Sequence, residues 1–121
     1  RSSWELEFNK YMDNNASVLR WASEPFPIPY IKPTDGRKHK YYVDYFVEYI
    51  NKLGNTVTEL VEIKPLNQVS QPKKTPRKKQ SVYLNECATY SVNCAKWHAA
   101  KQYAQYKGWT FRIITERELF N

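Results

Sequence analysis

The fold is decided by two stretches of sequence, YYVDYFVEYI at residues 41–50 and TVTELVEIK at residues 56–64. Both are rich in aromatic and β-branched residues, which favour β-strands. Between them lies NKLGN, residues 51–55, which is typical of a hairpin turn. A hairpin centred on Leu53 would place Asp44 opposite Glu62, because the two residues are equally far from that centre in the sequence.

The alternation of side chains along these strands brings charged groups together. Side chains point to opposite faces in turn, so Asp44 shares a face with Tyr42 and Phe46, and Glu62 shares one with Lys64. Residues directly opposite each other in an antiparallel pair have Cβ atoms about 4.5–5.5 Å apart. Two carboxylates at that distance repel each other unless a proton or a cation lies between them. The sequence therefore indicates a cation site at Asp44 and Glu62.

This set of residue types suits the hydrolysis of a phosphodiester bond. Mg²⁺ and Mn²⁺ prefer oxygen ligands, neutralise phosphate charge and activate water. Asp44 and Glu62 can supply carboxylate ligands, and the carbonyl of Ile63 can supply a further oxygen. Lys64 can orient the attacking water, lower its pKa or stabilise charge in the transition state. We expect a metal-dependent nuclease.

Composition sets limits on the class of protein. A chain of 121 residues is long enough for one domain with a single core, so we predict one domain over residues 1–121. The 41% of apolar and 16% of aromatic residues argue against a disordered chain. No run approaches the roughly 18 apolar residues of a membrane span, and we expect no membrane partner. The formal net charge of +7 favours a polyanionic partner such as DNA.

The segment at residues 65–80 has a different composition. It holds three prolines and no aromatic residue. Its basic side chains fall within seven positions and are Lys73, Lys74, Arg77, Lys78 and Lys79. This pattern predicts a mobile basic loop that contacts DNA phosphates. A solvated connector without a ligand is the alternative.

Helices are expected on both sides of the hairpin. Residues 1–15 have helical apolar spacing, with Glu5 in the first turn, where a carboxylate also suits the helix dipole. Residues 81–107 predict one bent helix, or two helices that meet at Asn93. The stripe expected to face the sheet consists of Leu84, Ala88, Val92, Ala95, Ala99 and Tyr103. Tyr90 and Trp97 fall outside this stripe.

The remaining elements are shorter. Residues 17–23 and 109–115 predict strands, and residues 116–120 a closing turn or helix. Residues 24–31 carry prolines at alternate positions, which allow only an edge strand or an extended surface segment.

The pattern of Asp44 followed by Glu62-Ile63-Lys64 resembles the PD-(D/E)XK nuclease motif, with Val43 where a proline usually precedes the aspartate. Three further stretches extend the resemblance over the whole chain: RSSWE at 1–5, NCAKWHAA at 93–100 and FRIITE at 111–116. In this order they resemble the TnsA-like endonucleases, including the head completion nucleases of large tailed phages.

The resemblance implies an α/β fold with a restriction-endonuclease-like core, in which helices flank a mixed, mostly antiparallel sheet. It implies that Glu5 joins Asp44 and Glu62 at a Mg²⁺ site, where Mn²⁺ can substitute, and that Lys96 contacts DNA. The implied substrate is double-stranded DNA, cut or trimmed as the packaged head is completed. Phage head or portal proteins are further implied partners, and the implied location is the host cytoplasm during assembly, with retention in the virion left open.

Two other functions remain open at this point. One is a basic structural protein of the phage head or neck that binds DNA or portal without cutting. The other is a junction or transposon-end nuclease of the same superfamily. The complete set of Glu5, Asp44, Glu62 and Lys64 favours an enzyme over a structural protein. A nuclease homologue that has lost its catalytic function commonly lacks at least one residue of the active site.

Overall fold

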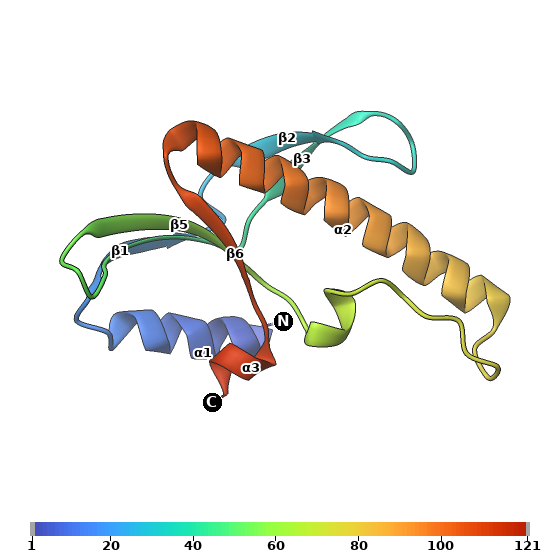
Figure 1. Ribbon diagram of the computed structural model, residues 1–121, viewed down its shortest axis with the longest axis horizontal. Helices are drawn as coiled ribbons and strands as arrows, with labels where there is room; N and C mark the ends of the chain where they lie inside the picture. The colour runs from blue at the N-terminus through green and yellow to red at the C-terminus, as the bar shows by residue number, and fades with distance from the viewer. Residues whose placement is uncertain (1, 121) are drawn as a thin grey trace.

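The computed structural model describes residues 2–120 (Figure 1). Its larger sheet has the strand order β1-β4-β5-β6 and is built from β1 (Val18–Ser23), β4 (Tyr45–Ile50), β5 (Thr56–Ile63) and β6 (Thr110–Ile114). Only the β5–β6 pair is parallel, and the other two pairs are antiparallel. A separate antiparallel pair joins β2 (Pro27–Ile31) to β3 (Lys38–Tyr42). The predicted mixed, mostly antiparallel sheet is confirmed.

Helices cover both faces of the larger sheet, α1 (Ser2–Asp13) on one and α2 (Gln80–Lys107) on the other (Figure 1). The short helices η1 (Leu66–Gln68) and α3 (Glu116–Leu119) follow β5 and β6. Each face has its own apolar core, one centred on Tyr45 and Val61 beneath α1, the other on Val43 and Leu60 beneath α2 and β2. Within residues 2–120 no helix is long and apolar enough to cross a membrane.

The β4–β5 hairpin has the register that the sequence predicts. Tyr45 pairs with Val61 and Ile50 with Thr56, so the hairpin is symmetric about Leu53. The side-chain oxygen of Asn51 accepts hydrogen bonds from the N–H groups of Leu53 and Asn55, at 3.0 and 2.9 Å. These bonds close the turn and fix which residues of the two strands face each other.

The single strand predicted over residues 41–50 is wrong, because the chain leaves one sheet after Tyr42 and enters the other at Tyr45. Val43 packs in the core beneath α2, whereas Tyr45 packs in the core beneath α1. The carbonyl of Asp44 accepts a hydrogen bond of 2.9 Å from Glu24 N–H at this break. The chain therefore crosses between layers at residues 43–44, and the alternation of side chains does not carry across.

The helix predicted at residues 81–107 is one uninterrupted helix, and Asn93 is buried within it. The predicted stripe is wrong at Leu84, which is 55% exposed, whereas Trp97 is 9% exposed and part of the core. The reason is that the N-terminal half of α2 extends largely beyond the sheets, and packing against the core begins near its end, at Tyr90 and Val92 (Figure 1). The helix ends at Gly108, whose φ of 77° is the left-handed conformation that glycine adopts readily.

We predict that Trp97→Ala lowers the free energy of unfolding by about 3–5 kcal/mol, the usual cost of removing a buried aromatic side chain. Leu84→Ala, on the protruding half of the same helix, should change it by less than about 0.5 kcal/mol. Urea unfolding of the two variants measures both values. Equal losses would mean that the N-terminal half of α2 is packed as tightly as the C-terminal half.

Candidate active site

The site is built around Asp44, at the break between β3 and β4. Asp44 Oδ2 accepts a hydrogen bond of 2.7 Å from the backbone N–H of Ile63. The register of the hairpin puts residue 44 opposite residue 62, so this carboxylate takes the place of a backbone acceptor that the broken strand no longer supplies. A buried N–H without an acceptor would be costly. Asp44 is thereby held at the end of β5.

Glu62 lies on β5, buried with 6% of its surface exposed. Its Oε1 accepts a hydrogen bond of 2.6 Å from the hydroxyl of Tyr41, and its Oε2 lies 3.6 Å from Nζ of Lys64. Burial, followed by the nearby charge of Asp44, raises the pKa of Glu62 to about 7. Burial is also the main reason why the pKa of Asp44 is raised, with a contribution from the charge of Glu5. The predicted convergence of Asp44, Glu62 and Lys64 is thus present.

Tyr41 is the residue of this site that the sequence did not reveal. Strand alternation assigned it to the face opposite Asp44, and the break at residues 43–44 removes that relation. Its ring is buried in the core beneath α2, and its hydroxyl is held against Glu62. The TVTELVEIK and YYVDYFVEYI patterns alone carry no signal for this contact, because β3 and β5 belong to different sheets.

Helix α1 brings Glu5 toward the same place. The hydroxyl of Tyr45 donates a hydrogen bond of 2.6 Å to Oδ1 of Asn9, and the carbonyl oxygen of Glu5 lies 3.2 Å from the same hydroxyl. The ring of Phe8 packs against Tyr45 with a centroid distance of 4.9 Å. These contacts seat α1 against β4, close enough for the charge of Glu5 to raise the pKa of Asp44.

The donor chemistry of the site fits a hard divalent cation. Asp44 and Glu62 offer carboxylate oxygens, and each is hard to ionise without a neighbouring positive charge. Within residues 2–120, no group of three or more acidic, cysteine or histidine side chains is arranged to hold a metal ion. Mg²⁺ commonly keeps several water ligands beside one or two carboxylates, so a pair of carboxylates is compatible with such a cation. The roles of Glu5 and of the Ile63 carbonyl as ligands stay predictions.

Lys96 on α2 lies beside the site. Its Nζ lies 5.6 Å from the centre of the Tyr41 ring and 6.0 Å from that of Tyr30. Burial and the nearby ammonium of Lys64 lower the pKa of Lys96. The structure thus places the ammonium group of Lys96 near that of Lys64 and over the ring of Tyr41, whose hydroxyl bonds to Glu62.

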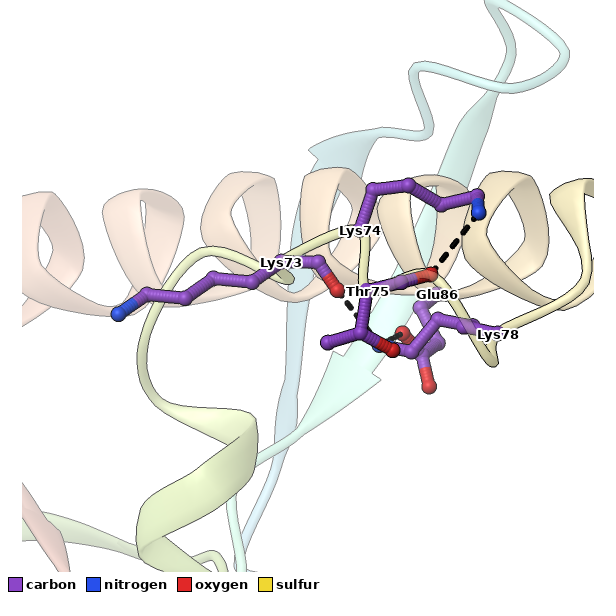
Figure 2. Close-up of polar contacts among 5 residues, drawn as sticks. All are labelled: Lys73, Lys74, Thr75, Lys78 and Glu86. Atoms are coloured by element: carbon purple, nitrogen blue, oxygen red, sulfur yellow. Dashed lines mark hydrogen bonds and ion pairs between the residues drawn. The ribbon is translucent and has the colours of Figure 1, made fainter.

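The basic loop does not present all of its lysines to solvent alike (Figure 2). Nζ of Lys78 bonds to Oε1 of Glu86 at 2.6 Å and to the carbonyl of Lys73 at 2.7 Å, and Lys74 bonds to the carbonyl of Thr75 at 3.0 Å. The exposed side chains of Lys73, Arg77 and Lys79 have no ion pair among residues 2–120. DNA contacts at these positions stay predictions.

Comparison with known proteins settles the family. The profile of the TnsA-like endonuclease N-terminal domain matches residues 15–116. The chain belongs to the TnsA-like endonucleases. The head completion nuclease of Enterobacteria phage T4 is 36% identical to this endonuclease over an alignment covering 96% of this chain and 77% of the phage protein. No solved structure matches the chain.

Family membership makes the protein a nuclease, a hydrolase that cuts within nucleic acid chains. The matched residues of this TnsA-like endonuclease include Asp44, Glu62, Lys64 and Lys96, and they begin after Glu5. The polar cluster at the end of β5 is therefore its candidate active site.

The stability of the metal-free protein should depend on the charge of Glu62. Its pKa is about 7 in the fold against an ordinary 4.5, so the folded state holds this proton more tightly than the unfolded state. That stabilisation is complete below about pH 4.5 and is lost as the pH rises through about 7. With divalent metals removed by a chelator at about pH 8, the free energy of unfolding of Glu62→Gln should therefore exceed that of wild type by about 1–3 kcal/mol. A difference of one pKa unit between the folded and unfolded states corresponds to about 1.4 kcal/mol.

Urea unfolding at about pH 4.5 and pH 8 measures this difference, which should shrink toward the lower pH. Glu7→Gln, on the exposed side of α1, is the control and should change stability little at either pH. Destabilisation of Glu62→Gln by the same amount at both values would show that burial of the charge is not costly.

Proposed function

We propose that this endonuclease uses Mg²⁺ to hydrolyse phosphodiester bonds of double-stranded DNA while a phage head is being completed. The observation that carries the chemistry is the pair of the half-buried Asp44 and the buried Glu62, with the ammonium of Lys64 at 3.6 Å from Glu62. The net charge of +7 supports a nucleic acid as substrate. The name of the phage T4 relative supports the stage of assembly.

The residues of the site have separate tasks in this proposal. Asp44 and Glu62 would hold the cation, with Glu5 approaching from α1. A bound Mg²⁺ supplies charge neutralisation at the phosphate and a more acidic water. The Lys64 ammonium, aligned by Glu62, stabilises the negative charge that builds up on the phosphate oxygens. Tyr41 fixes the orientation of Glu62 through its 2.6 Å hydrogen bond and so is a positioning residue.

The DNA backbone would lie across the basic side chains around this site. Lys96 would bind a phosphate beside the one that is cut. Lys73, Lys74, Arg77 and Lys79 would contact phosphates further along, while Lys78 holds the loop 65–80 to α2 through Glu86. Head or portal proteins are further proposed partners, met in the host cytoplasm during assembly.

Asp44→Asn should reduce cleavage at least about 100-fold, because the amide keeps an oxygen for Ile63 N–H but has no charge for a cation. Conversion of supercoiled plasmid to nicked or linear DNA with Mg²⁺ measures the rate. Asp35→Asn, a carboxylate on the exposed β2–β3 turn, is the matched control and should cut as wild type does. If wild type is as inert as Asp44→Asn on several DNA structures, the proposed catalytic function is wrong.

Binding of Mn²⁺, measured by calorimetry, should depend on the same carboxylates. Wild type should show a site that Asp44→Asn weakens at least about tenfold and that Lys64→Ala retains, because the lysine is no ligand. Lys64→Ala should still lose most of its cleavage rate. A structural protein of the head or neck would show no Mn²⁺ site dependent on Asp44 or Glu62.

A further inference from the structure

A groove of about 780 Å³ lies between the segment 67–78 and the protruding half of α2. The helix wall of this groove consists of residues three or four positions apart, which share one face: Val82, Asn85, Glu86, Thr89, Tyr90 and Asn93. No part of the catalytic cluster lines it. Tyr90, near the inner end of this wall, packs against the core beneath α2, and the rest of the lining is mostly polar.

Ionic contacts hold the two walls together. Lys78, on the loop, bonds to Glu86 on the helix at 2.6 Å and to the carbonyl of Lys73 at 2.7 Å (Figure 2). Glu86 is the one acidic residue among the residues described as lining the groove, and Lys78 offsets its charge. Figure 2 shows the Lys73 side chain extended away from this ion pair, and Lys73 is exposed. The groove therefore carries net positive charge.

The neutral part of the lining is rich in carboxamides. These groups donate and accept hydrogen bonds, and carboxamide side chains pair with the edges of nucleobases. Tyr90 adds an aromatic ring. The carboxamide residues of the two walls are Asn67, Gln68, Gln71, Asn85 and Asn93. Base-edge partners together with a lysine suit a nucleic acid strand better than they suit an apolar or a cationic ligand.

The residues at the inner end of the groove are close in sequence to residues of the candidate active site. Asn67 follows Lys64 by three residues, and Asn93 is one helical turn before Lys96 on the same face of α2. From Asn93 the groove extends along the helix to Val82, about 16 Å at 1.5 Å per residue. The inner end of a strand lying in it would therefore be directed toward Lys64 and Lys96.

The size of the groove decides which form of DNA enters it. Its volume is in the range of about 300–1,000 Å³ that encloses a drug-sized ligand, which a few unpaired nucleotides fill and a duplex greatly exceeds. We propose that the groove binds a short single-stranded segment next to the scissile phosphate. The substrate is then duplex DNA that is unpaired at the cut, such as a gap, an overhang or a branch. This substrate class rests on the proposed nuclease function, whereas binding in the groove does not.

Binding is tested with the 121-residue protein carrying Asp44→Asn, so that nothing is cut. The probe is a fluorescein-labelled oligothymidylate of about eight nucleotides, a usual site size for single strands, and fluorescence anisotropy measures its affinity. Adding Asn85→Trp fills the groove and should weaken binding about tenfold or more. Gln102→Trp, an exposed carboxamide on the other half of α2, is the matched control and should stay within about twofold. Equal affinity of the two variants would overturn the proposal.

A second pair of variants leaves the helix unchanged. Lys73→Glu, beside the groove, should weaken oligothymidylate binding several-fold more than Lys52→Glu in the exposed hairpin turn, although both make the same change in net charge. Equal losses would show that only the overall charge attracts the strand, and would also overturn the proposal.

Cleavage separates this inference from the proposed function. With Asp44 intact, wild type should cut a gapped duplex faster than the fully paired duplex of the same sequence, and Asn85→Trp should abolish that preference while Gln102→Trp keeps it. If wild type cuts DNA and the two tryptophan variants show the same preference for the gapped duplex, single-strand binding in the groove is wrong and the proposed nuclease function is unaffected. Loss of oligothymidylate affinity in Asn85→Trp without any cleavage by wild type would support the groove and refute the nuclease.

Discussion

The hydrogen bond from Ile63 N–H to the carboxylate of Asp44 is the constraint on which the rest of the site depends. It forms just before the chain enters the larger sheet at Tyr45, so a side chain supplies the acceptor that β5 lacks in its backbone partner. An aspartate there satisfies the backbone and keeps its other oxygen for further contacts. The same position also determines that Asp44 and Glu62 come from the ends of adjacent strands. One carboxylate therefore satisfies the backbone of β5 and, in the proposed function, would also bind the cation.

The crossing at residues 43–44 explains how two helices on opposite faces of the sheet can serve one site. Tyr41 lies before it and packs beneath α2, and Tyr45 lies after it and packs beneath α1. The hydroxyl of Tyr41 holds Glu62, whereas that of Tyr45 holds the first turns of α1 and with them Glu5. A continuous strand would have put both tyrosines on the same face. The break thus brings groups from both layers to the end of β5.

The features that could be predicted from the sequence are those determined by residues close together in the chain. The hairpin register follows from a turn and two alternating strands, and it is correct because all of its determinants lie within 25 or so residues. The contact of Tyr41 with Glu62 and the burial of Trp97 depend on which layer each segment joins, and periodicity does not carry that information. Leu84 shows the same limit, because its spacing is that of a buried residue while its half of α2 has no sheet beneath it. The convergence of Asp44, Glu62 and Lys64 was predictable, and the tyrosine that orients Glu62 was not.

The site holds partly buried groups of both charge signs, two carboxylates and two ammonium groups. A ligand that contains both a cation and an anion would match them. Burial raises the pKa of Asp44 and Glu62, which a cation would offset, and it lowers the pKa of Lys96, which an anion would offset. The salt bridge between Lys64 and Glu62 offsets only part of this cost, because among residues 2–120 neither Asp44 nor Lys96 forms a salt bridge. A divalent cation bound to a phosphodiester would place a positive charge in direct contact with a negative one. Burial of these charges therefore costs free energy, and in the proposed function a divalent cation together with a DNA phosphate would offset that cost.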